Sequence, residues 1–420
     1  MANKGGERLS EALKKTEYEE EHSEYISMVH HNSKGWITKA EINSGSYSQW
    51  HYKFSELLQQ DFDKENTYIS LNTFYTTYRR IECLKELKAH FIDLDIYKTK
   101  LTKTQILMDL EANYFNKSIP RPNYIIDSGR GLYLIWLINA VPSKGLPLWK
   151  AVEEYLYRVL KHFGADRQAL DPTRVLRVPG SINSKSNSVV KVINQYNYIY
   201  DLREIQNEYL PELGEKKEKK KGRPKKTVFI HRERSLYYAR IKDIIKLCEL
   251  REYDLRGHRE IILFLYRYYL CYFLEDTEKA LEDTLELNSE FISPLGVNEA
   301  TRATRSAERV YNDKNKDYKY KNETLIELLE ITEYEETYMT TIISKKEYKR
   351  RDREYQKNKY KAQLKKQGQL TEKEKISQRR EKIKDLLIKG LKQKDICLLL
   401  NISKPTYIRD RNFLKEQGSI

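Results

Sequence analysis

The stretch that most constrains the fold is HFIDLDIY, residues 90–97, in which two carboxylates alternate with apolar residues. Side chains of a β-strand alternate between two faces, so Asp93 and Asp95 share one face while Ile92 and Leu94 point into a core on the other. Two like charges about 7 Å apart on one strand repel each other and resist burial. A divalent cation between them would remove this repulsion. The solvated face of an edge strand would also accommodate them, and this stretch alone leaves both interpretations open.

Residues 124–138, YIIDSGRGLYLIWLI, predict a β-hairpin, because a glycine-rich turn separates two apolar runs that are rich in strand-forming residues. The turn offers backbone N–H groups and one guanidinium to an anion, from Ser128, Gly129, Arg130 and Gly131. An ordinary hairpin turn with an exposed arginine is the alternative.

Residues 169–185, ALDPTRVLRVPGSINSK, contain a third carboxylate, Asp171, which precedes Arg174, Arg177 and a Pro-Gly turn. The two arginines would project from the start of a short strand. An aspartate that caps a turn, followed by surface arginines, explains each residue singly but accounts less well for all of them together.

The order of these motifs, D-x-D, then S-G-x-G with a hydrophobic strand, then D ahead of R-x-x-R-x-P-G-S-x-N, resembles the archaeo-eukaryotic primase superfamily, the primase-polymerases. It is most similar to the versions in replication initiator proteins of plasmids and mobile elements of Gram-positive bacteria, over residues 68–200. The resemblance implies an α+β, RRM-like catalytic domain. It also implies that Asp93, Asp95 and Asp171 are the catalytic carboxylates and bind Mg²⁺ or Mn²⁺.

The resemblance further implies that the triphosphate of an incoming nucleotide is held by the hairpin turn and two arginines, namely Ser128, Gly129, Arg130, Gly131, Arg174 and Arg177. The family's second motif usually supplies a histidine to these phosphates, where this chain has Tyr133. A tyrosine hydroxyl can hydrogen-bond a phosphate, but it brings no positive charge at neutral pH. Either Arg130 compensates, or the domain binds nucleotides weakly or has lost synthesis.

With 420 residues, the chain is long enough for two or three domains. It has no apolar run of 18 residues and no apolar segment near its N-terminus, so we expect no membrane span, no signal peptide and a cytoplasmic location. Its four cysteines form no C-x-x-C pair, which argues against a zinc finger or a disulfide framework. The histidines show no His-x-His pair, which argues against a rolling-circle relaxase.

The net charge of +15 is concentrated in two stretches. Residues 215–226 carry a net +6 and residues 344–380 a net +10, which leaves about −1 for the other residues together. Basic residues gathered in this way favour a polyanion as partner, most simply nucleic acid. Solvated lysine-rich linkers and an AT-rich genome are the alternative explanation.

The pattern of apolar residues predicts five regions. Residues 35–205 form the catalytic domain, which includes a helix that ends at Gly164. A basic linker follows at 206–234, then an all-helical region at 235–345 that resembles the helical domain behind the catalytic domain of such primases. Residues 346–378 are a charged connector, and residues 379–420 a helix-turn-helix.

Three short helices are predicted at the C-terminus, over residues 380–388, 393–400 and 403–414, with Ser403 as the N-cap of the last. The stretch KDICLLLNISKPTYIRDRNFL resembles a helix-turn-helix of the resolvase or sigma-factor kind. Its last helix would present to DNA the side chains of Lys404, Thr406, Tyr407, Arg409, Asp410 and Arg411. A helical hairpin for protein contact is the alternative. The expected core comprises Ile388, Leu391, Ile396, Leu399, Leu400, Ile402, Ile408 and Phe413.

Together these features predict a replication initiator protein that binds origin DNA and synthesises a primer by metal-dependent nucleotidyl transfer. The expected partners are single-stranded template DNA, double-stranded origin DNA, nucleoside triphosphates and a host replication polymerase, with no membrane. The alternative is a non-catalytic origin-binding or transcription-regulating protein with a degenerate primase fold, which Tyr133 keeps open.

Overall fold

The computed structural model describes residues 21–418 except for residues 44, 63, 215–225 and 314–318. The chain forms two compact units, Met1–Ile342 and Ile343–Ile420, which we call the first and the second unit. Nearly all of the basic stretch predicted at 215–226 lies outside the described residues. None of the described helices is long and apolar enough to cross a membrane.

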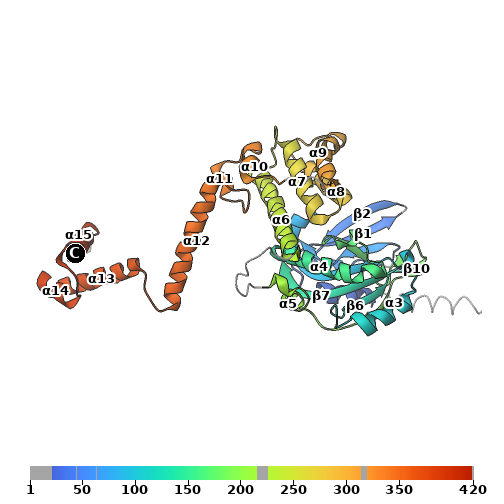
Figure 1. Cartoon of the computed structure of the whole chain (residues 1–420), viewed down its shortest axis with the longest axis horizontal. Helices are drawn as coiled ribbons and strands as arrows, with labels where there is room; N and C mark the ends of the chain where they lie inside the picture. Colours follow the sequence, from blue (N-terminus) through green and yellow to red (C-terminus); the bar gives the residue numbers. More distant parts are fainter. Residues whose placement is uncertain (1–20, 44, 63, 215–225, 314–318, 419–420) are drawn as a thin grey trace, which may run out of the picture. The chain divides into compact units, whose positions relative to one another are not determined.

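A five-stranded antiparallel sheet lies at the centre of the first unit (Figure 1). Its strand order is β11-β6-β7-β5-β4, with bounds Lys191–Gln195, Tyr124–Asp127, Leu132–Pro142, Leu84–Leu94 and Thr73–Phe74. The first seven residues of β7, LYLIWLI, are all buried, as expected for a continuous apolar run in a central strand. The predicted hairpin is confirmed as β6 and β7, which are joined by the glycine-rich turn.

A second antiparallel sheet has four strands in the order β2-β1-β3-β8. Their bounds are Ser46–Tyr52, Ile37–Asn43, Thr67–Ser70 and Val175–Arg177. A helix over residues 21–30 joins the two sheets, because the Tyr25 ring meets that of Tyr124 at 5.1 Å between centroids while His30 Nε2 lies 2.9 Å from the carbonyl of Ser70. A short hairpin, β9 and β10, follows at Ile182–Asn183 and Ser188–Val189.

Helix α4, Leu146–Leu160, completes the hydrogen bonding of the part of β5 that has no strand beside it. The indole of Trp149 donates to the carbonyl of Ala89 (2.8 Å), and the Glu153 carboxylate accepts from the N–H of Phe91 (3.2 Å). Glu153 also pairs with His90 at 2.7 Å. Because buried backbone groups require partners, these contacts hold β5 in place just before its two aspartates. The chain then reaches Gly164 in the left-handed conformation (φ 88°), as predicted for the end of this helix.

Helices α6, α8 and α9 pack as one group around α7, Arg259–Leu274 (Figure 1). Eleven of its 16 residues are buried, because its sequence REIILFLYRYYLCYFL is apolar on nearly every side. Besides α4 and α7, the labelled helices of this unit are α2 Phe54–Leu57, α3 Lys103–Asp109, α5 Leu202–Tyr209, α6 Lys226–Leu250, α8 Thr277–Ser289, α9 Val297–Asn312, α10 Asn322–Leu328 and α11 Glu333–Glu336.

The helical group is joined to the sheets by buried polar contacts. Arg80 pairs with Glu82 (3.0 Å) and with Glu290 of the stretch after α8, and the hydroxyl of Tyr266 donates to Glu82 (2.8 Å). The predicted catalytic and helical domains therefore lie within one compact unit. Within the predicted linker, residues 206–209 and 226–234 are helical, as the ends of α5 and α6.

The second unit consists of α12 Lys345–Lys366, α13 Glu372–Ile388, α14 Gln393–Leu399 and α15 Lys404–Glu416. The three helices predicted at the C-terminus are present. Their core is Ile383, Ile396, Tyr407 and Leu414, with Leu391, Leu400 and Ile402 packed against it. The predicted core is wrong for Ile388, Leu399, Ile408 and Phe413, which are exposed. In α15 the buried residues are 407, 410 and 414, one helical face to which neither Ile408 nor Phe413 belongs.

Candidate active site

The two aspartates of the D-x-D motif stand at the end of β5, where the strand leaves the sheet. Asp93 is the last but one residue of β5, and Asp95 follows the strand. Burial, and after it the charge of Asp95, raise the pKa of Asp93 to about 7. Asp166 adds to the repulsion, whereas the positive charges of Arg174 and Arg177 lower this pKa. The repulsion expected from the sequence is therefore present, together with charges that oppose it.

Asp166 is the third carboxylate of this site, and the sequence analysis missed it. Leu94 and Ala165 form an antiparallel bridge, in which Asp166 N donates to the carbonyl of Asp93 (2.8 Å) and Asp95 N to that of Gly164 (2.9 Å). Residues directly opposite each other in antiparallel pairs carry their side chains on the same face, so Asp166 lies beside Asp93. A side chain at Gly164 would begin 2.9 Å from the carbonyl of Asp95, which explains the glycine.

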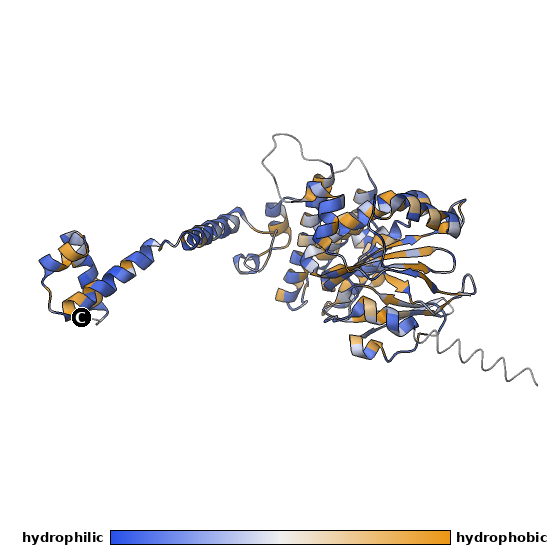
Figure 2. Ribbon diagram, turned by 90° about the horizontal axis from the view of Figure 1, so that it is seen from below, coloured by the Kyte–Doolittle hydropathy of each residue, from blue (hydrophilic) through white to orange (hydrophobic). Residues whose placement is uncertain are grey.

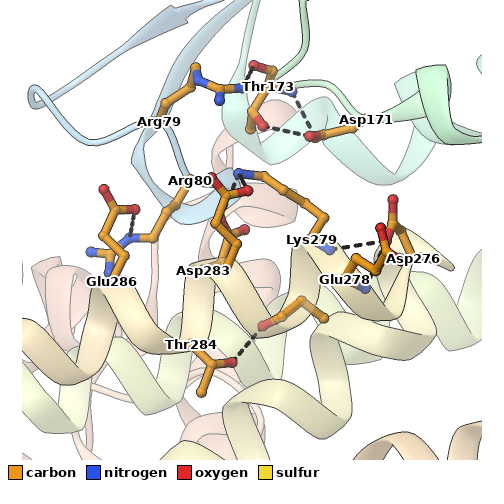
Figure 3. Close-up of polar contacts among 12 residues, drawn as sticks. Arg79, Arg80, Asp171, Thr173, Asp276, Glu278, Lys279, Asp283, Thr284 and Glu286 are labelled. Atoms are coloured by element: carbon orange, nitrogen blue, oxygen red, sulfur yellow. Dashed lines mark hydrogen bonds and ion pairs between the residues drawn. The ribbon is translucent and has the colours of Figure 1, made fainter. Parts of the chain in front are cut away.

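Asp171, the predicted third carboxylate, is held elsewhere (Figure 3). Its two oxygens accept hydrogen bonds from the backbone N–H (2.9 Å) and the hydroxyl (2.7 Å) of Thr173. Its charge acts on Arg79 and on Lys279 and Asp283 of α8. Asp171 thus caps the turn at Pro172, in line with the simpler explanation that the sequence left open. The carboxylate that stands opposite Asp93 is that of Asp166.

The two predicted arginines lie close to the carboxylates. Arg177 of β8 stands opposite Tyr68 of β3, with its guanidinium carbon 4.8 Å from the centre of that ring. Arg174 has a guanidinium nitrogen 3.8 Å from a carboxylate oxygen of Asp166. Because both arginines also act on the pKa of Asp93, they bring positive charge to the place where the carboxylates gather.

Tyr133 occupies the position directly opposite Asp93 on the neighbouring strand β7. Its side chain is 3% exposed, and its hydroxyl lies 3.5 Å from a guanidinium nitrogen of Arg177. Burial, and after it the charge of Asp93, raise the pKa of this hydroxyl, so it remains protonated at neutral pH. Tyr133 is therefore part of the same group of side chains as Asp93 and Arg177, as a neutral hydrogen-bonding residue.

The turn Ser128–Gly131 packs directly against the end of β5. A side chain at Gly131 would begin 2.1 Å from the carbonyl of Leu94, and Gly129 has φ 95°, so both positions require glycine. The N–H of Ser128 donates to the carbonyl of Gly131 (3.1 Å) and closes the turn. Arg130 is exposed, with its guanidinium carbon 4.0 Å from the centre of the Tyr97 ring.

Lys103 of α3 is a further cation at this turn, and no motif identified it. Its ammonium group donates to the carbonyl of Gly129 (2.7 Å) and pairs with Asp127 (2.5 Å). The turn is also anchored by Asn183, whose amide donates to the carbonyl of Ser128 (2.6 Å). The turn therefore carries two cations, Lys103 and Arg130, beside its backbone N–H groups.

The donor set suits a hard divalent cation, since Mg²⁺ and Mn²⁺ prefer carboxylate oxygens. In the side-chain arrangement of the described residues, no three His, Cys, Asp or Glu side chains are gathered closely enough to hold a metal ion. Asp95 instead pairs with Lys98 at 2.5 Å. The charges of both Asp95 and Asp166 nevertheless act on Asp93.

In the second unit, the predicted DNA-contacting residues differ in exposure. Lys404, Arg409 and Arg411 are exposed and Thr406 is half-buried. Tyr407 is 2% exposed and belongs to the core, and Asp410 is 1% exposed, so burial disfavours the contact with DNA predicted for these two residues. Ser403 accepts a hydrogen bond from the N–H of Thr406 (3.4 Å), which confirms it as the N-cap of α15.

The sequence matches no family model. It is 66% identical over 394 residues to a protein of Clostridium perfringens named "Replication protein", and the alignment covers 94% of this chain and 97% of that relative. The primase-polymerase domain of cyanophage S-2L is 16% identical, with a TM-score of 0.34, over 45% of this chain and 96% of that one.

Two crystal structures of the primase RepB′ are also similar. Its catalytic domain in complex with initiator DNA is 12% identical, with a TM-score of 0.29, over 45% of this chain and 95% of that one. A second structure of RepB′ is 10% identical, with a TM-score of 0.31, over 69% of this chain and 99% of that one.

Proposed function

Because the chain belongs to the family of replication proteins that includes the Clostridium perfringens relative, we propose that it starts replication by synthesising a primer on single-stranded DNA. The observation that carries this proposal is the gathering of Asp93, Asp95 and Asp166 at adjacent backbone positions. Two arginines and a hairpin turn rich in N–H groups lie beside them. Carboxylates next to phosphate-binding groups are what metal-dependent nucleotidyl transfer requires.

The three carboxylates would hold Mg²⁺ or Mn²⁺. Bound there, the metal ions would activate the attacking hydroxyl and stabilise the charge on the departing pyrophosphate. Asp171 has no part in this set, because its oxygens are bonded to Thr173.

The positively charged residues would bind and orient the triphosphate. Arg174 and Arg177 would neutralise the charge that builds up on the leaving group, and Arg130 and Lys103 lie at the turn that would receive the phosphates. Tyr133 would hold Arg177 in place through its hydroxyl and hydrogen-bond a phosphate oxygen. The positive charge that a histidine brings at this position in related motifs would come here from the neighbouring cations.

We propose duplex origin DNA as the partner of α13–α15. The second unit has 24 Lys and Arg against 10 Asp and Glu. Its net charge of +14 is nearly all of the chain's +15. The exposed side chains on α15 available for base or phosphate contacts are Lys404, Arg409 and Arg411, with Thr406 half-buried beside them.

The test is incorporation of labelled nucleotides on a single-stranded template with Mg²⁺ or Mn²⁺. The wild type should form product, whereas Asp93→Asn should form none and keep its affinity for duplex DNA. Asp171→Asn is the matched control, since it removes a nearby charge from outside the site and should retain most activity. A melting temperature of Asp93→Asn at or above that of the wild type would show that the variant is folded.

Absence of product from the wild type with either metal would overturn the proposal. If the same protein bound duplex DNA tightly, the second candidate, a non-catalytic origin-binding protein, would replace it. The observation that favours this candidate is Tyr133, which leaves the site without the charged side chain that related motifs carry there.

A further inference from the structure

Helix α12 has the largest net charge of the described elements, and it lies outside both the carboxylate site and helices α13–α15. It has 22 residues, of which 11 are Lys or Arg and three are Asp or Glu. Only Glu347 and Leu364 are buried, and the helix is hydrophilic along nearly its whole length (Figure 2). A helix of this kind gains almost nothing from packing in a core, so its composition calls for another explanation.

The cations of α12 are not spread evenly around the helix. At 100° per residue, six of them fall within a sector of about 120°. This basic stripe consists of Lys346, Lys349, Arg350, Arg353, Lys357 and Lys361. Its first and last residues are 15 positions apart, a length of about 22 Å along the helix axis.

The three acidic residues lie outside the stripe. Glu347 accepts hydrogen bonds from Arg350 and Arg351, which lower its pKa to about 2. Glu354 pairs with Arg350 at 3.3 Å. A helix stabilised only by its own ion pairs would need an acid for each cation at a spacing of three or four residues.

Four of the six cations of the stripe have no such partner. Within the described part of the chain, Lys349, Arg353, Lys357 and Lys361 form no ion pair, and all four are exposed. Four unpaired like charges on one helical face repel each other and reduce the stability of the helix. A polyanion bound along this face would attract these charges, so that they would stabilise the helix instead of destabilising it.

We propose that the basic stripe of α12 binds the phosphate backbone of duplex DNA, as a second contact beside the one proposed for α15. A length of about 22 Å corresponds to about six phosphates along one strand. Charge complementarity identifies this partner, and α12 and α13 are separated only by residues 367–371. The stripe reads no sequence, because contacts to phosphates position a protein without distinguishing bases. The inference extends the proposed origin binding and is independent of primer synthesis.

The experiment compares two triple variants of the full chain. Lys349→Gln, Lys357→Gln and Lys361→Gln remove three charges from the stripe. Lys359→Gln, Lys365→Gln and Lys366→Gln remove three exposed charges from other faces of the same helix. The affinity of each protein for a mixed-sequence duplex of about 30 base pairs is measured between about 50 and 200 mM salt.

The stripe variant should bind more than about tenfold more weakly near 0.1 M salt, and the slope of log affinity against log salt should fall by about 2 to 3. The control variant should lose less than about threefold, with a slope change below about 1. Equal losses in both variants would overturn the assignment to one face, and no loss in either would show that α12 is a solvated connector.

Two further measurements separate this proposal from other partners and from the proposed function. A stripe variant that loses affinity for single-stranded DNA but keeps its affinity for the duplex would overturn the choice of duplex DNA. Primer synthesis on a single-stranded template should be the same in the stripe variant and the wild type. A wild type that makes no primer would overturn the proposed catalysis and leave the comparison of duplex binding valid.

Discussion

The two units of the chain use charge in opposite ways. The first unit has 53 Lys and Arg against 52 Asp and Glu, whereas the second has 24 against 10. In the first unit many charges are buried and individually matched: Arg267, 2% exposed, bonds Thr304 (3.1 Å) and Glu308 (2.7 Å). In the second unit most charges are exposed. The exceptions among its described residues are two buried acids, Glu347, paired with Arg350 and Arg351, and Asp410, paired with Arg379 and Arg380.

This difference predicts in which unit a single substitution should have a large effect on function. In a region of matched charges, function depends on a few side chains in fixed positions, and loss of one partner leaves an uncompensated charge. In a region of exposed excess charge, binding energy is the sum of many small and salt-dependent contributions. We therefore expect all-or-none effects in the first unit and graded effects in the second, except in the small core of the second unit.

The largest contrast should come from two aspartates five positions apart. Asp166→Asn should reduce nucleotide incorporation by about a thousandfold, because it removes one of three proposed metal ligands. Asp171→Asn keeps an oxygen that can accept from Thr173 and should reduce it by less than about fivefold. Primer extension with both variants measures this ratio. Equal losses, or a larger loss in Asp171→Asn, would restore Asp171 to the catalytic set.

The next largest effect concerns the small core of the second unit, where a single substitution should have a large effect. Tyr407→Ala should lower the free energy of unfolding of this unit by about 3 kcal/mol, since it empties the centre of a core formed by few residues. Tyr407→Phe keeps the ring and should cost less than about 1 kcal/mol, with duplex binding unchanged. Denaturant unfolding of both variants, with the affinity for a duplex measured in parallel, distinguishes the roles. Weaker binding by a stably folded Tyr407→Phe would mean that the hydroxyl contacts DNA.

A smaller, pH-dependent effect follows from the pKa of Asp93, about 7 in the metal-free protein. Because a metal ion must displace this proton, the apparent affinity for Mg²⁺ should rise about tenfold per pH unit below about pH 7 and level off above it. Folding raises this pKa from about 4, so the stability that the protonated carboxyl contributes is complete below about pH 4 and is lost as the pH rises through about 7.

The Mg²⁺ concentration that gives half-maximal synthesis, measured at about pH 6, 7 and 8, tests this prediction. Asp171→Asn should follow the wild-type curve. A Mg²⁺ requirement that is the same at every pH would show that Asp93 is ionised before the metal binds, or that it is not a ligand.

The parts of the fold that were predictable from sequence depend on local patterns. Alternation of side chains identified β5, turn chemistry identified the β6–β7 hairpin, and capping residues identified the end of α4 and the start of α15. Placing the third carboxylate required non-local information, since Asp166 and Asp171 both precede turns. The bridge between Leu94 and Ala165 brings Asp166 beside Asp93, and the local sign of it is Gly164, where the backbone approaches Asp95.

The predicted buried face of the last helix in the second unit was wrong for a related reason. The apolar residues at 407, 408, 413 and 414 are compatible with two neighbouring faces of α15. The burial of Asp410 selects the face of Tyr407 and Leu414, because its carboxylate pairs with Arg379 and Arg380 from α13. A buried acid with partners on another helix is not visible in a periodic pattern of apolar residues.

The smallest effect concerns Tyr133, which belongs to the matched side chains of the first unit and stands where the family's motif usually has a histidine. Tyr133→Phe keeps the ring between the strands and removes the hydroxyl 3.5 Å from Arg177. If Tyr133 only orients this arginine, the KM for nucleotide should rise by about threefold while kcat stays within about twofold, because a long hydrogen bond contributes little. Steady-state kinetics with varied nucleotide concentration separates the two constants. A large fall in kcat with unchanged KM would mean that the hydroxyl acts in the transition state, and that the tyrosine has taken over the role of the histidine rather than leaving it to the cations nearby.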